Sequence, residues 1–327
     1  MQEPDRDPQR PFPPARIFFT GFAMGIADLI PGVSGGTMAF ILGIYEQLLN
    51  AIKSFNLKLV QLIFKGKFRE AITQIPWVFL IPLGLGLAVA ILSMARVMRF
   101  LLENHPVYLF SFFFGLILAS ILAVGVTVRW NPSTVIAMVV GTVAAFIIVG
   151  LVPLSMPNDP LTLFLSGTVA IMAMILPGIS GSFILLILGQ YAYVLNAVSD
   201  FNLIAILPVM LGAIVGLLGF ARVLSWLLAH YHDITVAVLV GFMAGSLRKI
   251  WPWKEVLETM VDRHGEVVPM RERNILPDFA GPEVWIALAL AVVGFLLLSF
   301  IDHLQTGANP IFTPLLGRRE PKPVVSG

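Results

Sequence analysis

The sequence predicts an all-α polytopic membrane protein with two inverted-topology repeats, each a re-entrant helical hairpin plus about three transmembrane helices. The first observation behind this prediction is composition. The 327 residues are 57% hydrophobic and only 12% charged, whereas soluble domains carry about 25% charged residues. The mean hydropathy is +0.89, so lipid must surround much of the surface. The other two observations are a series of long apolar segments and an internal repeat.

Six uninterrupted apolar segments are predicted to cross the bilayer, because a span takes about 20 apolar residues. These segments are 77–101, 107–128, 132–153, 203–229, 234–250 and 284–301. The polar, proline-rich residues 1–16 precede the first apolar stretch, which begins at Ile17, and we expect them to form a cytoplasmic N-terminal tail. Residues 251–283 are predicted to be an extramembrane loop, and residues 304–327 a C-terminal tail.

Two further apolar regions, 17–52 and 161–198, are each interrupted by the motif P-G-x-S-G. Proline removes a backbone donor, and glycine leaves the helical region freely. Each arm has about 14–16 residues, or roughly 21–24 Å of helix, which is too short for a hydrocarbon core of about 30 Å. We therefore predict re-entrant hairpins. The alternative is one kinked spanning helix followed by an amphipathic tail.

The internal repeat is visible in two aligned blocks. Residues 31–57 match residues 177–203 at 14 of 27 positions, and the shared residues include proline, serine, tyrosine and asparagine. Residues 82–102 match residues 208–228 at 10 of 21 positions, including an arginine. Shared polar residues at fixed spacing are not expected from apolar composition alone, so the chain contains two copies of one unit.

The two blocks align at different shifts, which places 20 extra residues in the first copy. They fall in the basic, amphipathic stretch 53–76. We assign repeat 1 to residues 17–153 and repeat 2 to residues 161–303. A hairpin returns to its own side, so three further crossings invert the second copy relative to the first. If the hairpins crossed the membrane instead, the two repeats would be parallel.

The distribution of basic residues predicts the orientation. With the N-terminus in the cytoplasm, twelve Lys and Arg residues lie on the cytoplasmic side and six on the outer side. The six are all in or next to the 251–283 loop, and long loops follow the positive-inside rule less strictly. We therefore expect a cytoplasmic N-terminus.

The interrupted motifs are candidate substrate-binding elements, because a helix N-terminus carries unpaired N–H groups and partial positive charge that suit a phosphate. Serine and threonine hydroxyls add further donors. The candidate residues at the two hairpin tips are Ser34, Gly35, Gly36, Thr37, Ser180, Gly181 and Ser182. The alternative is that small residues let the two tips pack closely.

Charged residues within the apolar segments supply the remaining candidates, because their burial in a membrane is costly. Arg96 and Arg222 occupy equivalent repeat positions, and Ser246 and Arg248 close an apolar segment. Snorkelling to the interface is the alternative for the arginines. The carboxylates of Asp28 and Glu46 have no counterpart in repeat 2, so they are candidates for coupling to a proton or sodium ion.

Several chemistries are disfavoured. The chain has no cysteine and no metal-ligand spacing such as H-E-x-x-H, so we expect no metal, no cofactor and no nucleic-acid partner. The G-x-S-G pattern around Ser34 also allows an intramembrane serine protease, but the histidines lie at or beyond helix ends, away from a base position. A small-anion transporter, an ion-coupled transporter or a channel is a third possibility. We expect transport without enzymatic catalysis.

Three motifs resemble a known bacterial family. They are A-D-L-I-P-G-V-S-G-G-T at 27–37, L-P-G-I-S-G-S at 176–182, and G-S-L-R at 245–248 followed by W-P-W at 251–253. This combination resembles the polyprenyl-phosphate transporters of the PopT group, over roughly residues 15–303. The resemblance implies a flippase of the cytoplasmic (inner) membrane that returns undecaprenyl phosphate, the carrier lipid of cell-wall biogenesis, from the outer to the inner leaflet.

Overall fold

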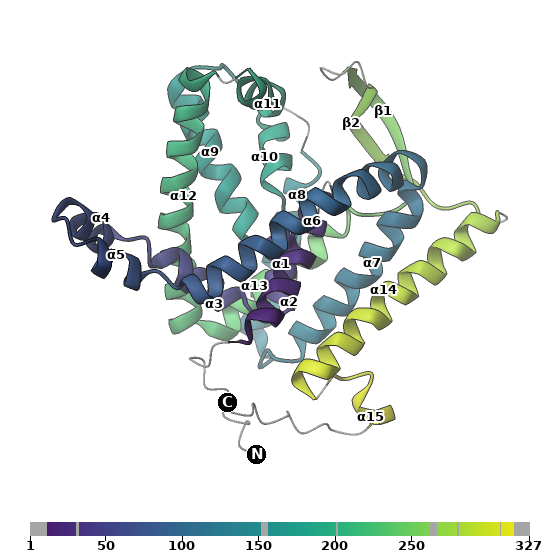
Figure 1. Cartoon of the computed structure of the whole chain (residues 1–327). Helices are drawn as coiled ribbons and strands as arrows, with labels where there is room; N and C mark the ends of the chain where they lie inside the picture. Colours follow the sequence, from purple (N-terminus) through teal and green to yellow (C-terminus); the bar gives the residue numbers. More distant parts are fainter. Residues whose placement is uncertain are drawn as a thin grey trace.

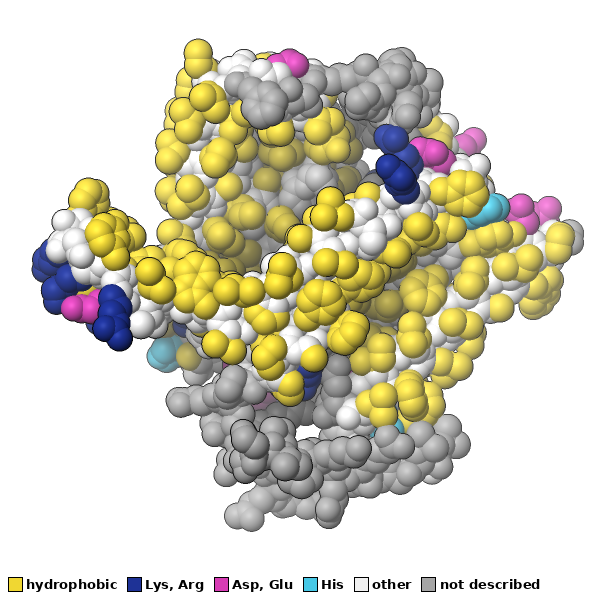
Figure 2. Space-filling view, in the orientation of Figure 1, with side chains coloured by type: hydrophobic (Ala, Val, Ile, Leu, Met, Phe, Trp, Pro, Cys, Tyr) yellow, Lys and Arg dark blue, Asp and Glu magenta, His cyan; other side chains and the backbone are white. Residues whose placement is uncertain are grey.

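A computed structural model describes residues 12–30, 33–151, 156–200, 202–261, 267–279, 281–307 and 309–316 (Figure 1). Most of these residues are helical, and four helices are long and apolar enough to cross a membrane: Trp77–Asn104, Pro106–Gly125, Leu203–His230 and Pro282–Leu304, the last being part of the helix Pro282–Thr306. The prediction of a mostly helical, multi-pass membrane protein is confirmed. Figure 2 shows hydrophobic side chains spread over the visible face of these helices.

The described residues of the first half of the chain form eight helices. They are α1 (Pro14–Asp28), α2 (Gly35–Ile41), α3 (Tyr45–Lys53), α4 (Leu57–Phe64), α5 (Phe68–Gln74), α6 (Trp77–Asn104), α7 (Pro106–Gly125) and α8 (Pro132–Ile148). Proline begins α1, α7 and α8, where its missing N–H leaves no bond unmade. Asn131 caps α8 through a reciprocal pair of hydrogen bonds with Thr134.

The second half follows the same order. Its elements are α9 (Pro160–Ile175), α10 (Gly181–Ile187), α11 (Tyr191–Ser199), α12 (Leu203–His230), α13 (His232–Ser246), β1 (Lys254–Val261), β2 (Val267–Asn274), α14 (Pro282–Thr306) and α15 (Thr313–Leu316). Three pairs of equivalent helices have equal lengths. Helices α2 and α10 have 7 residues each, α3 and α11 have 9, and α6 and α12 have 28.

Helix pairing links the two halves. Helix α1 packs along α6, and α9 packs along α12 in the same manner. The remaining long contacts cross between the halves, because α7 packs along α14 and α8 along α13. Figure 1 shows α11 at one end of the molecule and α3 towards the opposite end. The equivalent segments after the two interruptions therefore lie on different sides.

Each hairpin differs from the prediction in its second arm. The sequence suggested one half-helix of about 14–16 residues, but the chain turns sharply after α2 and α10. The chain direction bends by 118° between α10 and α11. The turns lie at Gly43 and Gly189, which have φ angles of +75° and +70°. Glycine adopts this left-handed conformation without a Cβ clash, so the helix ends there.

The spans at 132–153 and 234–250 are shorter than predicted. Helix α8 ends at Ile148 and has 17 residues, while α13 ends at Ser246 and has 15. Both are apolar but fall below the length of the four spanning helices. They pack against each other, with Gly141 and Gly245 at close backbone approaches. These two helices are therefore too short to be counted among the four spanning helices, and they pack against each other.

The predicted 251–283 loop contains an antiparallel β-hairpin, so the all-α prediction is wrong at this point. Strands β1 and β2 pair from Lys254–Asn274 to Val261–Val267. The cross-strand neighbours Glu255 and Arg273 form an ion pair of 2.6 Å. Hydropathy identifies membrane spans but carries little information about strand pairing outside the membrane, which is why the sequence did not predict the hairpin.

The basic insert 53–76 forms the α4–α5 helical hairpin, which projects from the side of the molecule (Figure 1). Several of its apolar side chains are exposed, including Leu57 at 79% and Phe64 at 87%. Repeat 2 has no counterpart, since α12 begins at Leu203, the residue equivalent to Leu57. The insertion lies where the change of alignment shift predicts it.

Candidate functional site

The two hairpin tips meet in the interior of the protein. The Oγ1 atom of Thr37 accepts a 2.8 Å hydrogen bond from the backbone N–H of Gly178. The hydroxyl of Ser34 donates a 3.2 Å hydrogen bond to the carbonyl of Met174. Ser34 and Thr37 are only 1% and 0% exposed. The structure therefore brings the two interrupted motifs together. The hydroxyls of Ser34 and Thr37 make the contact with backbone groups of the second half.

The first tip is also ordered by its own side chains. Ser34 caps α2 by accepting a 3.1 Å hydrogen bond from the N–H of Gly36. The carboxylate of Asp28, at the end of α1, accepts a 2.6 Å hydrogen bond from the N–H of Gly35. A Cβ atom at Gly36 would lie 2.7 Å from the carbonyl oxygen of Met174. Glycine at this position allows the opposite hairpin to approach.

The second tip has a similar cap with different neighbours. Ser180 accepts a 3.2 Å hydrogen bond from the N–H of Phe183, and its hydroxyl lies 2.8 Å from that of Ser182. Gly178 has a φ of +96°, and a Cβ atom there would lie 2.8 Å from the hydroxyl of Ser246. The buried Ser246, at the end of α13, thus packs against this tip. The structure thus brings the G-S-L-R motif at 245–248 into contact with the L-P-G-I-S-G-S motif at 176–182.

The repeat-related arginines lie elsewhere. Arg96 is exposed on α6, and Arg222 is exposed on α12. The guanidinium of Arg222 donates hydrogen bonds to the carbonyls of Leu218, at 2.6 Å, and Phe55, at 3.2 Å. It thus connects α12 to the chain just after α3, rather than to a hairpin tip.

The coupling candidates are also separated. Asp28 lies at the first tip, whereas Glu46 is exposed in the first turn of α3. One carboxylate oxygen of Glu46 lies 3.9 Å from Nε2 of His232, which is itself exposed at the start of α13. The structure does not bring the two carboxylates into one cluster.

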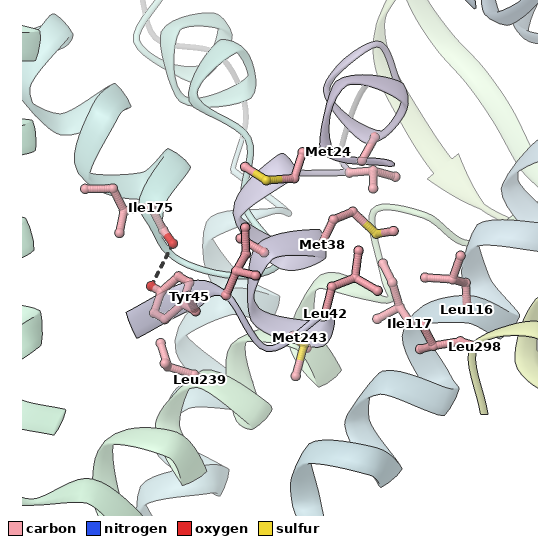
Figure 3. Close-up of a cluster of buried hydrophobic side chains, with 14 of the residues drawn as sticks. Met24, Met38, Leu42, Tyr45, Leu116, Ile117, Ile175, Leu239, Met243 and Leu298 are labelled. Atoms are coloured by element: carbon pink, nitrogen blue, oxygen red, sulfur yellow. Dashed lines mark hydrogen bonds between the residues drawn. The ribbon is translucent and has the colours of Figure 1, made fainter. Parts of the chain in front are cut away.

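Sequence reasoning missed the role of Tyr45. Its side chain is 3% exposed, and its hydroxyl donates a 2.8 Å hydrogen bond to the carbonyl of Ile175, just before the second tip (Figure 3). Tyr191 is the repeat partner but is 38% exposed. The repeat alignment contained both tyrosines, yet it could not show that only one of them bridges the two hairpins.

A cationic cluster follows the C-terminal end of α13. Arg248 stands over the ring of Phe146 at 4.4 Å and donates a 3.0 Å hydrogen bond to its carbonyl. The next residue, Lys249, and Lys254 of β1 each lie 3.1 Å from one carboxylate oxygen of Glu272 on β2. Sequence reasoning missed Lys254 and Glu272, because the β-hairpin that joins them was not predicted.

Burial and neighbouring charges shift two pKa values in this cluster. Burial, aided by the charge of Lys249 and opposed by Glu272, lowers the pKa of Lys254 to about 8. Burial alone would raise the pKa of Glu272, but Lys249 and Lys254 hold it below its usual range. Glu272 is therefore a carboxylate held between two lysines.

The described residues contain no group of three or more His, Cys, Asp or Glu side chains that could hold a metal ion. The polar groups that converge in the structure are hydroxyls and backbone groups at the tips, and cations around Arg248. Such an arrangement can bind an anion and can join two structural units. In the described part of the chain, none of the serines at the tips has a histidine as its hydrogen-bond partner.

Residues 24–268 match the family described as undecaprenyl phosphate translocase-like. A Vibrio cholerae protein named polyprenyl-phosphate transporter is 42% identical over 289 residues, which cover 86% of this chain and 94% of the relative. A Staphylococcus aureus protein of the same name is 34% identical over 251 residues, covering 71% and 84%. No solved structure matches significantly. The resemblance of the motifs is confirmed, and the chain belongs to the undecaprenyl phosphate translocase-like family.

Proposed function

We propose that this protein is a flippase that moves undecaprenyl phosphate, or a related polyprenyl phosphate, from the outer to the inner leaflet of the bacterial cytoplasmic membrane. Two relatives named polyprenyl-phosphate transporters cover most of the chain. The observation that carries the proposal is the meeting of the two interrupted hairpins, through Thr37 and Gly178, inside a multi-pass protein. Broken helices at membrane depth are typical of transporter sites.

The inverted-topology arrangement is part of the proposal. The equal lengths of three pairs of equivalent helices and the crossed pairs α7–α14 and α8–α13 support two related halves. The separation of α3 from α11 in Figure 1 supports opposite orientations. The excess of basic residues on one side supports a cytoplasmic N-terminus. A substrate could then be released to either side by movement of one half against the other.

The proposed work of the protein is to lower the barrier to the phosphate, since the apolar tail can remain in lipid. Moving one charge into a low-dielectric medium has an idealised cost of order 20 kcal/mol. The groups proposed to reduce it are Ser34, Gly35, Gly36, Thr37, Ser180, Gly181, Ser182, Arg96, Arg222, Ser246 and Arg248. Because Ser34 and Thr37 are buried in the contact between the tips, a substrate would reach them only when the tips separate.

Coupling to a proton or sodium ion is proposed at Asp28 and Glu46. Asp28 is the better placed, because its carboxylate accepts the hydrogen bond from Gly35 within the first tip. Protonation or ion binding there would weaken that bond and alter the tip. Glu46 lies instead next to His232, so its role would be independent of the tip contact.

The test is movement of a polyprenyl phosphate between leaflets of proteoliposomes that contain the full-length protein. We expect wild-type protein to accelerate movement above that in empty liposomes. We expect Ser34→Ala and Arg96→Ala to slow it. The matched controls are Ser93→Ala, whose hydroxyl bonds only within exposed α6, and Arg99→Ala on the same helix. Melting temperatures separate lost transport from lost folding.

The outcomes distinguish function from site. If all variants move the polyprenyl phosphate equally fast, the flippase function is supported and the proposed binding residues are excluded. No movement by folded wild-type protein would contradict the function, and uptake of small anions and cleavage of membrane peptides would then be measured for the two alternative functions.

A further inference from the structure

Two hollows adjoin each other on the β-hairpin side of the protein. The first has a volume of about 420 Å³ and is lined by Phe114, Phe146, Leu247, Arg248, Trp251 and Asn274, among others. The second, of about 280 Å³, lies between α7 and α14. Phe114 and Trp251 line both hollows. The two hollows therefore lie on either side of these two aromatic side chains, and they differ in chemistry.

The first end is cationic. Within the part of the chain that the structure describes, the guanidinium of Arg248 donates to the carbonyl of Phe146, while a guanidinium has five N–H donors. The backbone of Arg248 is held by a 2.8 Å hydrogen bond from Asn274. Next to it, Lys249 and Lys254 share the single carboxylate of Glu272. Among the described side chains, the two lysines share one carboxylate and the neighbouring Arg248 adds a third cation, an excess of positive charge that suits a phosphate.

The second end is almost entirely apolar. Its walls include Gly115 and Leu118 of α7, and Ala291, Val292 and Phe295 of α14. The two helices approach closely where Gly115 faces the backbone of Ala291. Val292 is 55% exposed, so this groove opens on the outer surface of α14, one of the helices apolar enough to cross the membrane. A branched hydrocarbon chain in the bilayer could slide into it sideways.

We infer that these hollows form a docking site for the polyprenyl phosphate, with the phosphate at Arg248 and the first isoprene units in the α7–α14 groove. The inference rests on the proposed function and adds a part that recognises the tail. A free phosphate would use only the cationic end, and an uncharged isoprenoid only the groove. A lipid phosphate uses both, because the two hollows adjoin at Phe114 and Trp251.

This site is separate from the hairpin tips but connected to them. Ser246, two residues before Arg248, packs against Gly178 of the second tip. Lys249 lies over the ring of Phe183, in α10, at 4.9 Å. A headgroup bound at Arg248 would therefore lie beside the helix that begins at the second tip. Docking at this site would place the lipid next to the proposed path before the tips separate.

The test is equilibrium binding of radiolabelled farnesyl phosphate to the full-length protein in detergent, with farnesol, octyl phosphate and inorganic phosphate as competitors. We expect Val292→Trp, which fills the groove from an exposed position, to weaken farnesyl phosphate binding about tenfold. Val293→Trp is the matched control, since Val293 is similarly exposed, at 52%, but does not line the groove. Leu288→Trp, also in the groove lining, is a second filling variant should Val292→Trp fold poorly.

The headgroup end is tested with Arg248→Gln. We expect it to weaken farnesyl phosphate binding about tenfold or more, the effect of losing a charge-assisted contact, and to leave farnesol competition unchanged. Arg273→Gln is the control, because Arg273 lies on the adjoining β-hairpin but pairs with Glu255. Farnesyl phosphate should compete better than octyl phosphate, and both better than inorganic phosphate.

Three results would overturn the inference. Equal effects of Val292→Trp and Val293→Trp would exclude the groove as the tail site. Wild-type affinity in Arg248→Gln would exclude the headgroup position. Inorganic phosphate competing as well as farnesyl phosphate would identify a free-anion site instead. Wild-type leaflet movement, measured in parallel, separates these failures from failure of the function: movement without groove-dependent binding overturns only this inference.

Discussion

The hydroxyl of Thr37 accepts a 2.8 Å hydrogen bond from the backbone amide of Gly178, which lies 141 residues away in the chain. This bond joins the tips of the two interrupted hairpins. Thr37 is fully buried, so no water can replace it as a partner for the amide. Thr37 thus joins Ser34 and Tyr45 among the side chains that hydrogen-bond across the two halves, and its repeat counterpart is Phe183, which has no hydroxyl.

We predict that Thr37→Val destabilises the protein by about 1–3 kcal/mol, because the buried amide of Gly178 loses its acceptor. The measurement is thermal unfolding of the purified protein, together with leaflet movement. Thr235→Val is the matched control, since the buried hydroxyl of Thr235 bonds only to the carbonyl of Tyr231 in the same helical turn. Equal melting temperatures for the two variants would show that the bond between the tips does not stabilise the fold.

Tyr45 and Tyr191 provide a comparison within one chain. Tyr45→Phe removes a buried 2.8 Å hydrogen bond to Ile175, and we expect a loss of about 1 kcal/mol in the free energy of unfolding. Tyr191→Phe should change little, because Tyr191 is partly exposed. Thermal unfolding of both variants measures the difference. A larger effect at Tyr191 would contradict the assignment of Tyr45 as the bridging residue.

Gly178→Ala is expected to disturb the second tip. A Cβ at a φ of +96° is strained, and it would also press on the hydroxyl of Ser246 and the carbonyl of Phe242. We expect a lower melting temperature and slower leaflet movement. Gly219→Ala is the control: nothing lies within 4 Å of a Cβ there, and alanine favours a helix by about 1 kcal/mol. The hypothesis fails if Gly178→Ala is as stable as wild type.

The stability of the β-hairpin region should depend on pH. The folded state holds the pKa of Lys254 at about 8, below the 10.5 of a free lysine. Between these values the unfolded chain binds more protons, so stability should rise with pH from about 8 to 10.5. Below pH 8 the full cost of burying the charged amine remains. Glu272 stays ionised in both states across this window, because its pKa is lowered.

The measurement is the pH dependence of thermal unfolding followed by tryptophan fluorescence, to which Trp251 and Trp253 contribute. Lys254→Met should remove the rise in stability between pH 8 and pH 10.5. Lys58→Met is the control, because Lys58 is an exposed lysine of the α4–α5 hairpin. An identical pH dependence in wild type and Lys254→Met would contradict the lowered pKa.

The sequence by itself showed that lipid surrounds this protein, where the two apolar regions are interrupted, and that one unit occurs twice in the chain. Each of these features is local or is a comparison of two stretches. Low charge content and long apolar runs require lipid. The P-G-x-S-G motifs end a helix wherever they occur. The insertion that became α4–α5 follows from a change of alignment shift alone.

Tertiary structure decided what the marked residues touch. Thr37 and Gly178 are far apart in the chain, and no pattern within one segment shows which atoms will meet. Packing placed Ser34 and Thr37 in the tip contact and left Arg96 and Arg222 on exposed helix faces. Strand pairing brought Glu272 to Lys249 and Lys254. Hydrophobicity selects which segments enter the membrane, but steric fit and hydrogen-bond satisfaction between segments select the partners.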